Sequence, residues 1–205
     1  MDAKVSAVLD AYHERMCKER EGTFRGGPPR GGGDFRDQAL LAVGHDAGQL
    51  INLLARSMEA PRILEIGTSF GYSGIWLAEA ARASKGHVTT LEMLEHKSTY
   101  AREMAGKAGL GDYIDFKIGD ALDLINEMPG PWDFVLLDLW KDLYVPSLEA
   151  FYPKLRSGAI IVADNMIRPG GPEVGKYGKA VRAKPKMTSI LLPVGQGLEI
   201  SRYEG

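Results

Sequence analysis

Apolar residues recur at helical spacing in the N-terminal part of the chain. Positions three or four residues apart predict an amphipathic helix that ends near Glu19. These positions are Val5, Val8, Leu9, Tyr12 and Met16. The stretch at residues 26–33 is rich in glycine and proline, so it cannot hold a regular element and is predicted to be a mobile loop. A second helical pattern covers approximately residues 37–58 and leads to Pro61.

From residue 62 onward, short apolar runs alternate with helical segments. Strands are predicted near residues 62–66, 87–92, 113–118, 132–138 and 158–164. Helices are predicted near residues 72–83, 94–108, 121–127 and 143–155. This alternation is typical of a parallel sheet covered by helices on both faces. Residues 188–192 and 198–203 flank the sequence P-V-G-Q-G, which predicts an antiparallel hairpin that closes the sheet.

The composition indicates one soluble domain. The chain has 205 residues, of which 44% are hydrophobic, enough for a sizeable core in a single domain over residues 1–205. Residues 1–36 would form its N-terminal helix and flexible loop. There is neither a signal-peptide pattern nor an apolar run long enough to span a membrane. Cys17 is the only cysteine, which excludes an intrachain disulfide and fits a reducing cytoplasm.

The charge distribution argues against nucleic acid as a partner. The formal net charge is -2, so the chain has no general basic field for a phosphate backbone. Arg25, Arg30 and Arg36 accompany the glycine-rich stretch, but the stretch is short and lacks an aromatic repeat, so a lid or linker is the simpler interpretation. Small molecules are the expected partners.

Two predicted strands end in oxygen-bearing side chains, Asp138 on one strand and Asp164 with Asn165 on the other. Ligands of open parallel sheets bind at the carboxyl ends of the strands, so these three side chains can converge on one hard cation. Lys141 would lie beside it and could take a proton from a hydroxyl that the cation acidifies. Taken singly, such residues are more often turn residues or helix caps.

A glycine-containing turn after the first predicted strand favours function over that alternative. Gly67 and Gly71 allow close approach of a ligand to the backbone and to the following helix N-terminus. Glu92 ends the second strand, where it could bind a ribose diol, and Asp120 after the third could accept from an adenine amine. Alone, these two acids would more often be solvated strand-end charges. The spacing of the glycines does not match a dinucleotide fingerprint.

Two motifs resemble those of class I S-adenosylmethionine-dependent O-methyltransferases of the cation-dependent catechol and caffeoyl-CoA type. Residues 137–144 read L-D-L-W-K-D-L-Y, similar to L-D-H-W-K-D-R-Y of the catechol branch, and Trp140 favours that branch over the plant-type D-A-D-K. Residues 163–172 read A-D-N-M-I-R-P-G-G-P, similar to A-D-N-V-I-C-P-G-A-P. The sequence V-G-H-D-A-G-Q at residues 43–49 resembles V-G-D-A-K-G-Q. The resemblance covers roughly residue 41 to the C-terminus.

The resemblance implies a Rossmann-like, doubly wound α/β fold with a seven-stranded, mostly parallel sheet and an antiparallel C-terminal hairpin. It implies Asp138, Asp164 and Asn165 as ligands of Mg²⁺ or Mn²⁺ and Lys141 as the base. With Asp120 added, the candidate contacts to S-adenosylmethionine are Val43, Glu65, Gly67, Ser73, Glu92, Asp120, Ala121, Asp138 and Trp140. The candidate acceptor-side residues are Lys141, Asn165, Pro169 and Glu199.

The expected reaction is methyl transfer to one hydroxyl of a catechol-like small molecule. Glu199 lies in G-L-E, similar to the family's D-G-L-E, which implies a hydrogen bond with the second catechol hydroxyl; the alternative is a solvent-facing strand residue. The upstream aromatic gate of catechol-type enzymes has no tryptophan here, and Phe35 is a candidate substitute. Residues 173–179 also differ from the family and are expected to line the acceptor pocket.

Several alternatives stay open from the sequence. The acceptor could be a caffeoyl-CoA-like ester or another natural product, and the chain could act alone or as a homodimer. A phosphotransferase would need phosphate-cradling glycines followed by lysine and serine or threonine, which the sequence lacks. A non-catalytic nucleoside-binding module would have no use for the acid, amide and lysine set.

Overall fold

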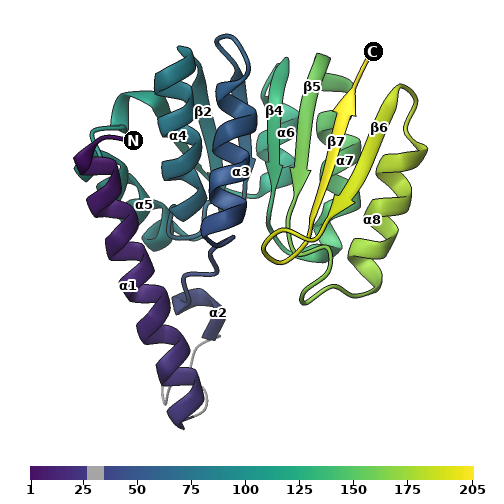
Figure 1. Ribbon diagram of the computed structural model, residues 1–205. Coiled ribbons are helices and arrows are strands. Elements are labelled where there is room, and N and C mark those ends of the chain that lie inside the picture. The colour runs from purple at the N-terminus through teal and green to yellow at the C-terminus, as the bar shows by residue number, and fades with distance from the viewer. Residues whose placement is uncertain (27–34) are drawn as a thin grey trace.

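The computed structural model describes residues 1–26 and 35–205. Within them, one sheet of seven strands has the order β3-β2-β1-β4-β5-β7-β6 (Figure 1). The strands are β1 (Arg62–Ile66), β2 (His87–Glu92), β3 (Ile114–Ile118), β4 (Trp132–Leu137), β5 (Leu155–Ala163), β6 (Met187–Leu192) and β7 (Leu198–Tyr203). β1 to β5 pair in parallel, and β7 pairs antiparallel with both β5 and β6. The predicted fold class and C-terminal hairpin are therefore confirmed.

Helices cover both faces of this sheet, as Figure 1 shows. They are α1 (Ala3–Gly26), α2 (Phe35–Gln38), α3 (His45–Arg56), α4 (Tyr72–Ser84), α5 (Glu95–Lys107), α6 (Ala121–Glu127), α7 (Tyr144–Phe151) and α8 (Pro172–Ala183). Short 3-10 turns are η1 (Gly111–Tyr113), η2 (Lys141–Leu143) and η3 (Tyr152–Lys154). None of the helices in the described part of the chain is long and apolar enough to cross a membrane.

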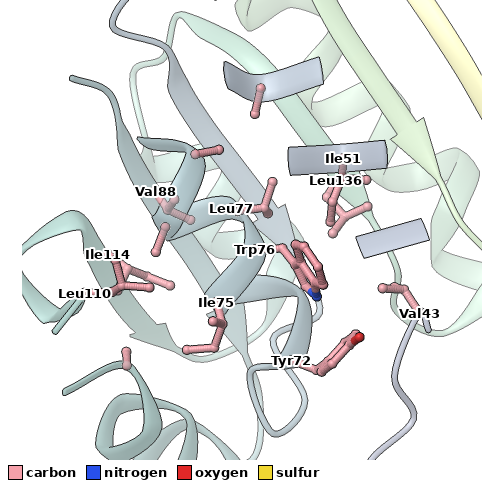
Figure 2. Close-up of a cluster of buried hydrophobic side chains, with 14 of the residues drawn as sticks. Val43, Ile51, Tyr72, Ile75, Trp76, Leu77, Val88, Leu110, Ile114 and Leu136 are labelled. Atoms are coloured by element: carbon pink, nitrogen blue, oxygen red, sulfur yellow. The ribbon is translucent and has the colours of Figure 1, made fainter. Parts of the chain in front are cut away.

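Successive side chains of the central strands point to opposite faces of the sheet and pack into two separate hydrophobic cores. Phe134 and Leu136 of β4 face α1, α3, α4 and α5, whereas Val135 and Leu137 face α6, α7 and α8. Figure 2 shows part of the first core, in which Trp76 of α4 packs beside the residues from α3 and β4. Because the central strands are apolar on both faces, they read as continuous hydrophobic runs in the sequence.

The structure corrects the prediction for the region before β1. The single helix expected over residues 37–58 is divided into α2 and α3. Leu41 and Gly44 between them have positive φ angles of 48° and 86°, which a helix cannot contain, and α3 starts only at His45. The N-terminal helix extends to Gly26 instead of ending near Glu19. Residues 27–33 of the predicted mobile loop lie outside the described residues.

Helix α8 was missing from the sequence-based assignment. Its residues Val174, Tyr177, Gly178 and Val181 are buried at helical spacing, and Pro172 stands in its first turn, where proline is favoured. Residues 173–179, expected to line an acceptor pocket, lie in this helix. Val174 and Tyr177 belong to the second core, on the face of the sheet that α6, α7 and α8 cover.

Candidate active site

Two carboxylates lie side by side at the carboxyl edge of the sheet because β4 and β5 are neighbours. The backbone amide of Asp138 donates to the carbonyl of Ile66 of β1 at an N···O distance of 2.9 Å. The backbone amide of Asp164 donates to the carbonyl of Leu137 of β4 at 3.1 Å. β1 and β4 are adjacent in the sheet although β2 and β3 come between them in the chain. This reversal of strand order creates the crevice in which open α/β sheets bind ligands.

Asp164 is the clearest sign of a cation site. Its side chain is 0% exposed, and neither carboxylate oxygen has a hydrogen-bond partner among the described residues. Burial, and then the charge of Asp138, raise the pKa of Asp164. An ionised carboxylate is costly in this position unless a positive charge compensates it. Two carboxylates and an adjacent amide oxygen form a donor set suited to Mg²⁺ or Mn²⁺.

This donor set is small. No group of three or more His, Cys, Asp or Glu side chains that could hold a metal occurs within residues 1–26 and 35–205. A cation bound here would therefore depend on Asp138, Asp164 and Asn165, completed by water or by an acceptor molecule. Asn165 directly follows Asp164 and has a left-handed backbone with φ 59°. Asparagine tolerates this conformation better than most residues.

Lys141 lies within hydrogen-bond distance of Asp138. Its Nζ donates to Oδ1 of Asp138 at 3.1 Å, to the carbonyl of Leu139 at 3.0 Å and to the hydroxyl of Tyr144 at 2.8 Å. The three N–H groups of an ammonium match three acceptors. The predicted proximity of Lys141 to Asp138 is thus found, and the amine is held beside the candidate cation ligands.

Tyr144 is a site residue that the sequence reasoning did not single out. Its hydroxyl accepts from Lys141 and donates to the backbone carbonyl of Asp164 at 3.0 Å. Burial, followed by the charges of Asp138 and Asp164, raises the pKa of Tyr144, so the hydroxyl keeps its proton. The only sequence indication was its place as the final letter of L-D-L-W-K-D-L-Y.

Glu65 of β1 is a second buried acid, among the residues predicted to contact S-adenosylmethionine. Its Oε2 accepts from the hydroxyl of Thr90 at 2.5 Å, and the Thr90 oxygen lies 2.5 Å from that of Thr68. Its Oε1 has no partner among the described residues. Burial raises the pKa of Glu65 to about 7, against opposing hydrogen bonds from Ser73 and Thr90. Thr68 and Thr90 were not predicted as site residues.

Glu92 joins the ends of β1 and β2. Its Oε2 accepts from the amide of Ser69 at 2.8 Å and its Oε1 from the amide of Leu94 at 3.0 Å. Ser69 belongs to the glycine-containing turn, so the carboxylate predicted to bind a ribose is held against that turn. Glu92 is thus half-buried and hydrogen-bonded to the backbone, and its contact to a ribose stays a prediction.

Gly67 allows the turn after β1 to meet the end of β4. A Cβ at Gly67 would lie 2.1 Å from the carbonyl oxygen of Asp138, and the residue has φ 103°. Only glycine fits both the space and the backbone conformation. Gly67 was predicted to allow close approach of a ligand; in the structure it allows close approach of the chain's own backbone at Asp138.

The remaining candidate cofactor residues differ in their surroundings. Asp120 caps α6, since its Oδ1 accepts from the amides of Leu122 at 2.8 Å and Asp123 at 3.1 Å, and its adenine contact stays a prediction. Ala121 is the first residue of α6. Val43 and Ser73 are buried, whereas Trp140 is 48% exposed.

Glu199 is engaged inside the protein. Its side chain is 0% exposed. Its two carboxylate oxygens accept from Nε and Nη2 of Arg182 at 2.9 and 2.7 Å, and the Ser189 hydroxyl also donates to it. The alternative of a solvent-facing residue is therefore wrong. An acceptor hydroxyl would have to displace Arg182, so the predicted substrate contact receives no support from this environment. Pro169 is exposed on the loop after Asn165, and the side chain of Phe35 lies outside the described part of the chain.

The sequence of residues 35–203 matches the family described as O-methyltransferase. The chain belongs to this family. The motif-based assignment of the chain to it is thus confirmed, and the relatives include both of its expected branches, catechol and caffeoyl-CoA O-methyltransferases.

Curated relatives within the family match a large part of the chain. A catechol O-methyltransferase from Mycobacterium tuberculosis is 39% identical over 139 residues, which cover 67% of this chain and 63% of the relative. One from Niastella koreensis is 35% identical, covering 63% and 60%. The match thus spans less than two thirds of the length of both relatives. A caffeoyl-CoA O-methyltransferase from Petroselinum crispum is 28% identical, covering 80% and 77%.

Solved structures of O-methyltransferases share the fold. The enzyme from Bacillus cereus, in complex with SAH, has a TM-score of 0.77 and 26% identity, covering 100% of this chain and 92% of that one. TomG from Streptomyces achromogenes, in complex with SAM, has a TM-score of 0.75 and 27% identity, covering 100% and 91%. The Rossmann-like, mostly parallel architecture is therefore that of the O-methyltransferase family.

Proposed function

We propose that this protein transfers the methyl group of S-adenosylmethionine to one hydroxyl of a catechol-like small molecule and that Mg²⁺ or Mn²⁺ is required. The observation that carries this proposal is the fully buried carboxylate of Asp164, which has no hydrogen-bond partner within the described ranges, with Asp138 and Lys141 at the same sheet edge. A non-catalytic nucleoside-binding module would not need that arrangement.

S-adenosylmethionine would occupy the crevice between β1, β2 and β4. Glu92 would accept from the ribose hydroxyls, and the first turn of α4 offers backbone amides and a partial positive charge to the methionine carboxylate. The complexes of the Bacillus cereus and Streptomyces achromogenes proteins with SAH and SAM support this choice of methyl donor.

Asp138, Asp164 and Asn165 would hold the divalent cation. When bound, the cation would lower the pKa of an acceptor hydroxyl and help to orient it. Lys141 would accept the proton from that hydroxyl, and Asp138, Leu139 and Tyr144 hold its amine in place. The acceptor oxygen would then attack the methyl carbon, and the bond from that carbon to sulfur would break. Alignment of the two reactants is the second contribution of the site.

The acceptor class rests on the similarity to catechol O-methyltransferases. The Mycobacterium tuberculosis relative is 39% identical in sequence over two thirds of this chain. A caffeoyl-CoA-like ester is the second candidate because the Petroselinum crispum relative matches a larger share, 80%, of the chain. Catechols and caffeoyl-CoA-like esters both have a vicinal dihydroxyphenyl group, so the same chemistry would serve either acceptor.

The test is a methyl-transfer assay with S-adenosylmethionine and catechol, catechol acids or caffeoyl-CoA, with Mg²⁺ and after exhaustive chelation. We expect transfer to one hydroxyl of a catechol only with the metal present. Asp164→Asn should abolish transfer while largely retaining S-adenosylmethionine binding, measured by calorimetry. Full turnover after chelation would refute the metal requirement, and absence of transfer to every vicinal diol would refute the acceptor class.

A further inference from the structure

We propose that Gln196, in the loop between β6 and β7, is a positioning residue that orients the side-chain amide of Asn165 toward the cation. The inference rests on the proposed cation site and concerns a contact that the family motifs do not identify. The family's D-G-L-E has aspartate where this chain has Gln196, whose carboxamide reaches one methylene further.

Two acceptors bind the amide nitrogen of Asn165. Its Nδ2 donates to Oε1 of Gln196 at 3.0 Å and, more weakly, to the backbone carbonyl of Arg168 at 3.4 Å. A backbone carbonyl can only accept, so the NH2 group and not the oxygen must face this side. Both amide hydrogens are then engaged, and Oδ1, the only atom of the side chain that can bind a cation, is left for the site.

Without this contact, electrostatics would favour the wrong orientation. The neighbouring carboxylates of Asp138 and Asp164 attract the partially positive NH2 group of Asn165, and in the described part of the chain neither oxygen of Asp164 has a partner. A 180° rotation of the amide would point NH2 toward the position of the cation and repel it. Gln196 opposes that rotation because it supplies a competing acceptor on the other side.

The backbone of Gln196 is held independently of its side chain. Its carbonyl accepts from the amides of Ile167 at 3.0 Å and Arg168 at 2.8 Å, and the next carbonyl, of Gly197, accepts from Met166 at 3.0 Å. The loop between β6 and β7 thus stays joined to the loop that follows β5 when the side chain of Gln196 is truncated. A substitution at this position therefore tests the amide contact itself.

The experiment measures Mn²⁺ binding to the full chain by electron paramagnetic resonance, without acceptor or S-adenosylmethionine. Hydrogen bonds that orient a metal ligand are typically worth roughly 10- to 100-fold in metal affinity, so Gln196→Ala should raise the Kd for Mn²⁺ by about 10-fold. Gln196→Glu keeps an acceptor and should bind at least as tightly as the parent. Gln49→Ala, which truncates an exposed glutamine on α3, is the matched control and should change nothing.

A double-mutant cycle separates orientation from a general loosening of the loop. Asn165→Gly removes the amide and tolerates the positive φ angle at this position. Adding Gln196→Ala to it should cause no further loss of Mn²⁺ affinity if Gln196 acts through Asn165. An undiminished effect in the Asn165→Gly background, or parent-like affinity of Gln196→Ala, would overturn the inference while leaving the cation site intact. A parent protein that binds no Mn²⁺ would overturn both.

Discussion

Tyr144 bridges the proposed base and the loop that carries two proposed cation ligands. Its hydroxyl contacts the Lys141 amine on one side and the Asp164 carbonyl on the other. At the residue scale, the position of the lysine amine is therefore decided by three acceptors that differ in kind: a carboxylate, a backbone carbonyl and a phenol. The carboxylate and the phenol can each be removed by a substitution, whereas the backbone carbonyl cannot.

Lys141→Met should lower kcat for methylation of a catechol by roughly 10²- to 10⁴-fold, because a positioned proton acceptor is lost. The affinity for S-adenosylmethionine should barely change, which calorimetry can measure. The deficit should shrink at high pH, where solution hydroxide can take the proton instead. Equal pH profiles of variant and parent would assign Lys141 a structural role.

Tyr144→Phe should lower kcat by about 5-fold, because a loss on the order of 1 kcal/mol is expected for a missing hydrogen bond. The ring that contacts Tyr177 in the core is retained, so the affinity for S-adenosylmethionine should stay at the parent value. In a Lys141→Met background the substitution should have little further effect on kcat. A full additive loss there would show that Tyr144 does not act through Lys141.

At the scale of elements, the site depends on the ends of three neighbouring strands meeting at one place. Gly67 after β1 lies against the backbone of Asp138 after β4. Glu92 at the end of β2 bonds to the same turn through Ser69. The proposed cofactor side and the proposed cation side thus meet at Gly67, and a clash at Gly67 should affect both.

Gly67→Ala should destabilise the protein by more than about 2 kcal/mol, because a Cβ would clash with the Asp138 carbonyl at a φ angle unsuited to alanine. Urea unfolding should show the loss, and both S-adenosylmethionine and Mn²⁺ should bind more weakly. Gly106→Ala on α5 is the control, since a Cβ there meets nothing within 4 Å and alanine favours a helix. Parent-like stability of Gly67→Ala would contradict the packing described.

Glu92→Ala should weaken S-adenosylmethionine binding by roughly 1 to 3 kcal/mol, because a charged acceptor for the ribose is removed. Mn²⁺ affinity should be unchanged. Glu95→Ala removes the same charge from an exposed position in the first turn of α5 and should have little effect on either ligand. Unchanged cofactor affinity in Glu92→Ala would place the ribose elsewhere.

At the scale of the whole molecule, acidic side chains are buried in the sheet that separates the two apolar cores. Asp164 and Glu65 are each fully buried and each has carboxylate oxygen without a partner among the described residues. Ionisation of such groups opposes folding unless a ligand compensates the charge. The unliganded protein should therefore lose stability in the pH range in which these groups ionise.

Glu65→Gln tests this dependence at a residue that is not itself a proposed cation ligand. Burial raises the pKa of Glu65 from 4.5 to about 7, so its contribution to stability is fully present below about pH 4.5 and lost as pH rises through about 7. The parent should therefore lose more unfolding free energy between pH 5 and 8 than Glu65→Gln, by on the order of 1 to 3 kcal/mol. Urea unfolding in chelator, without S-adenosylmethionine, measures the difference; equal losses would contradict the pKa shift.

Features that depend on neighbours in the chain were predictable from the sequence. The strands at residues 62–66, 87–92 and 198–203 have the predicted bounds, because runs of buried strand residues and the turn residues around them are local patterns. The same holds for Lys141, which lies three residues from Asp138 in a short turn. Asp138, Asp164 and Asn165 could be proposed as cation ligands because each follows a predicted parallel strand, and such strands end at the same edge of the sheet; the family motifs imply the same three residues.

Only the tertiary structure decided the contacts that join distant segments. The break between α2 and α3 depends on two positive φ angles, of which only the one at Gly44 falls on a glycine. The burial of Glu199 follows from Arg182 on α8, and the orientation of Asn165 from Gln196, 31 residues later. The strand order β5-β7-β6 brings these partners together. Side-chain pairing across elements is set by that order and register, which leave no periodic pattern in the sequence.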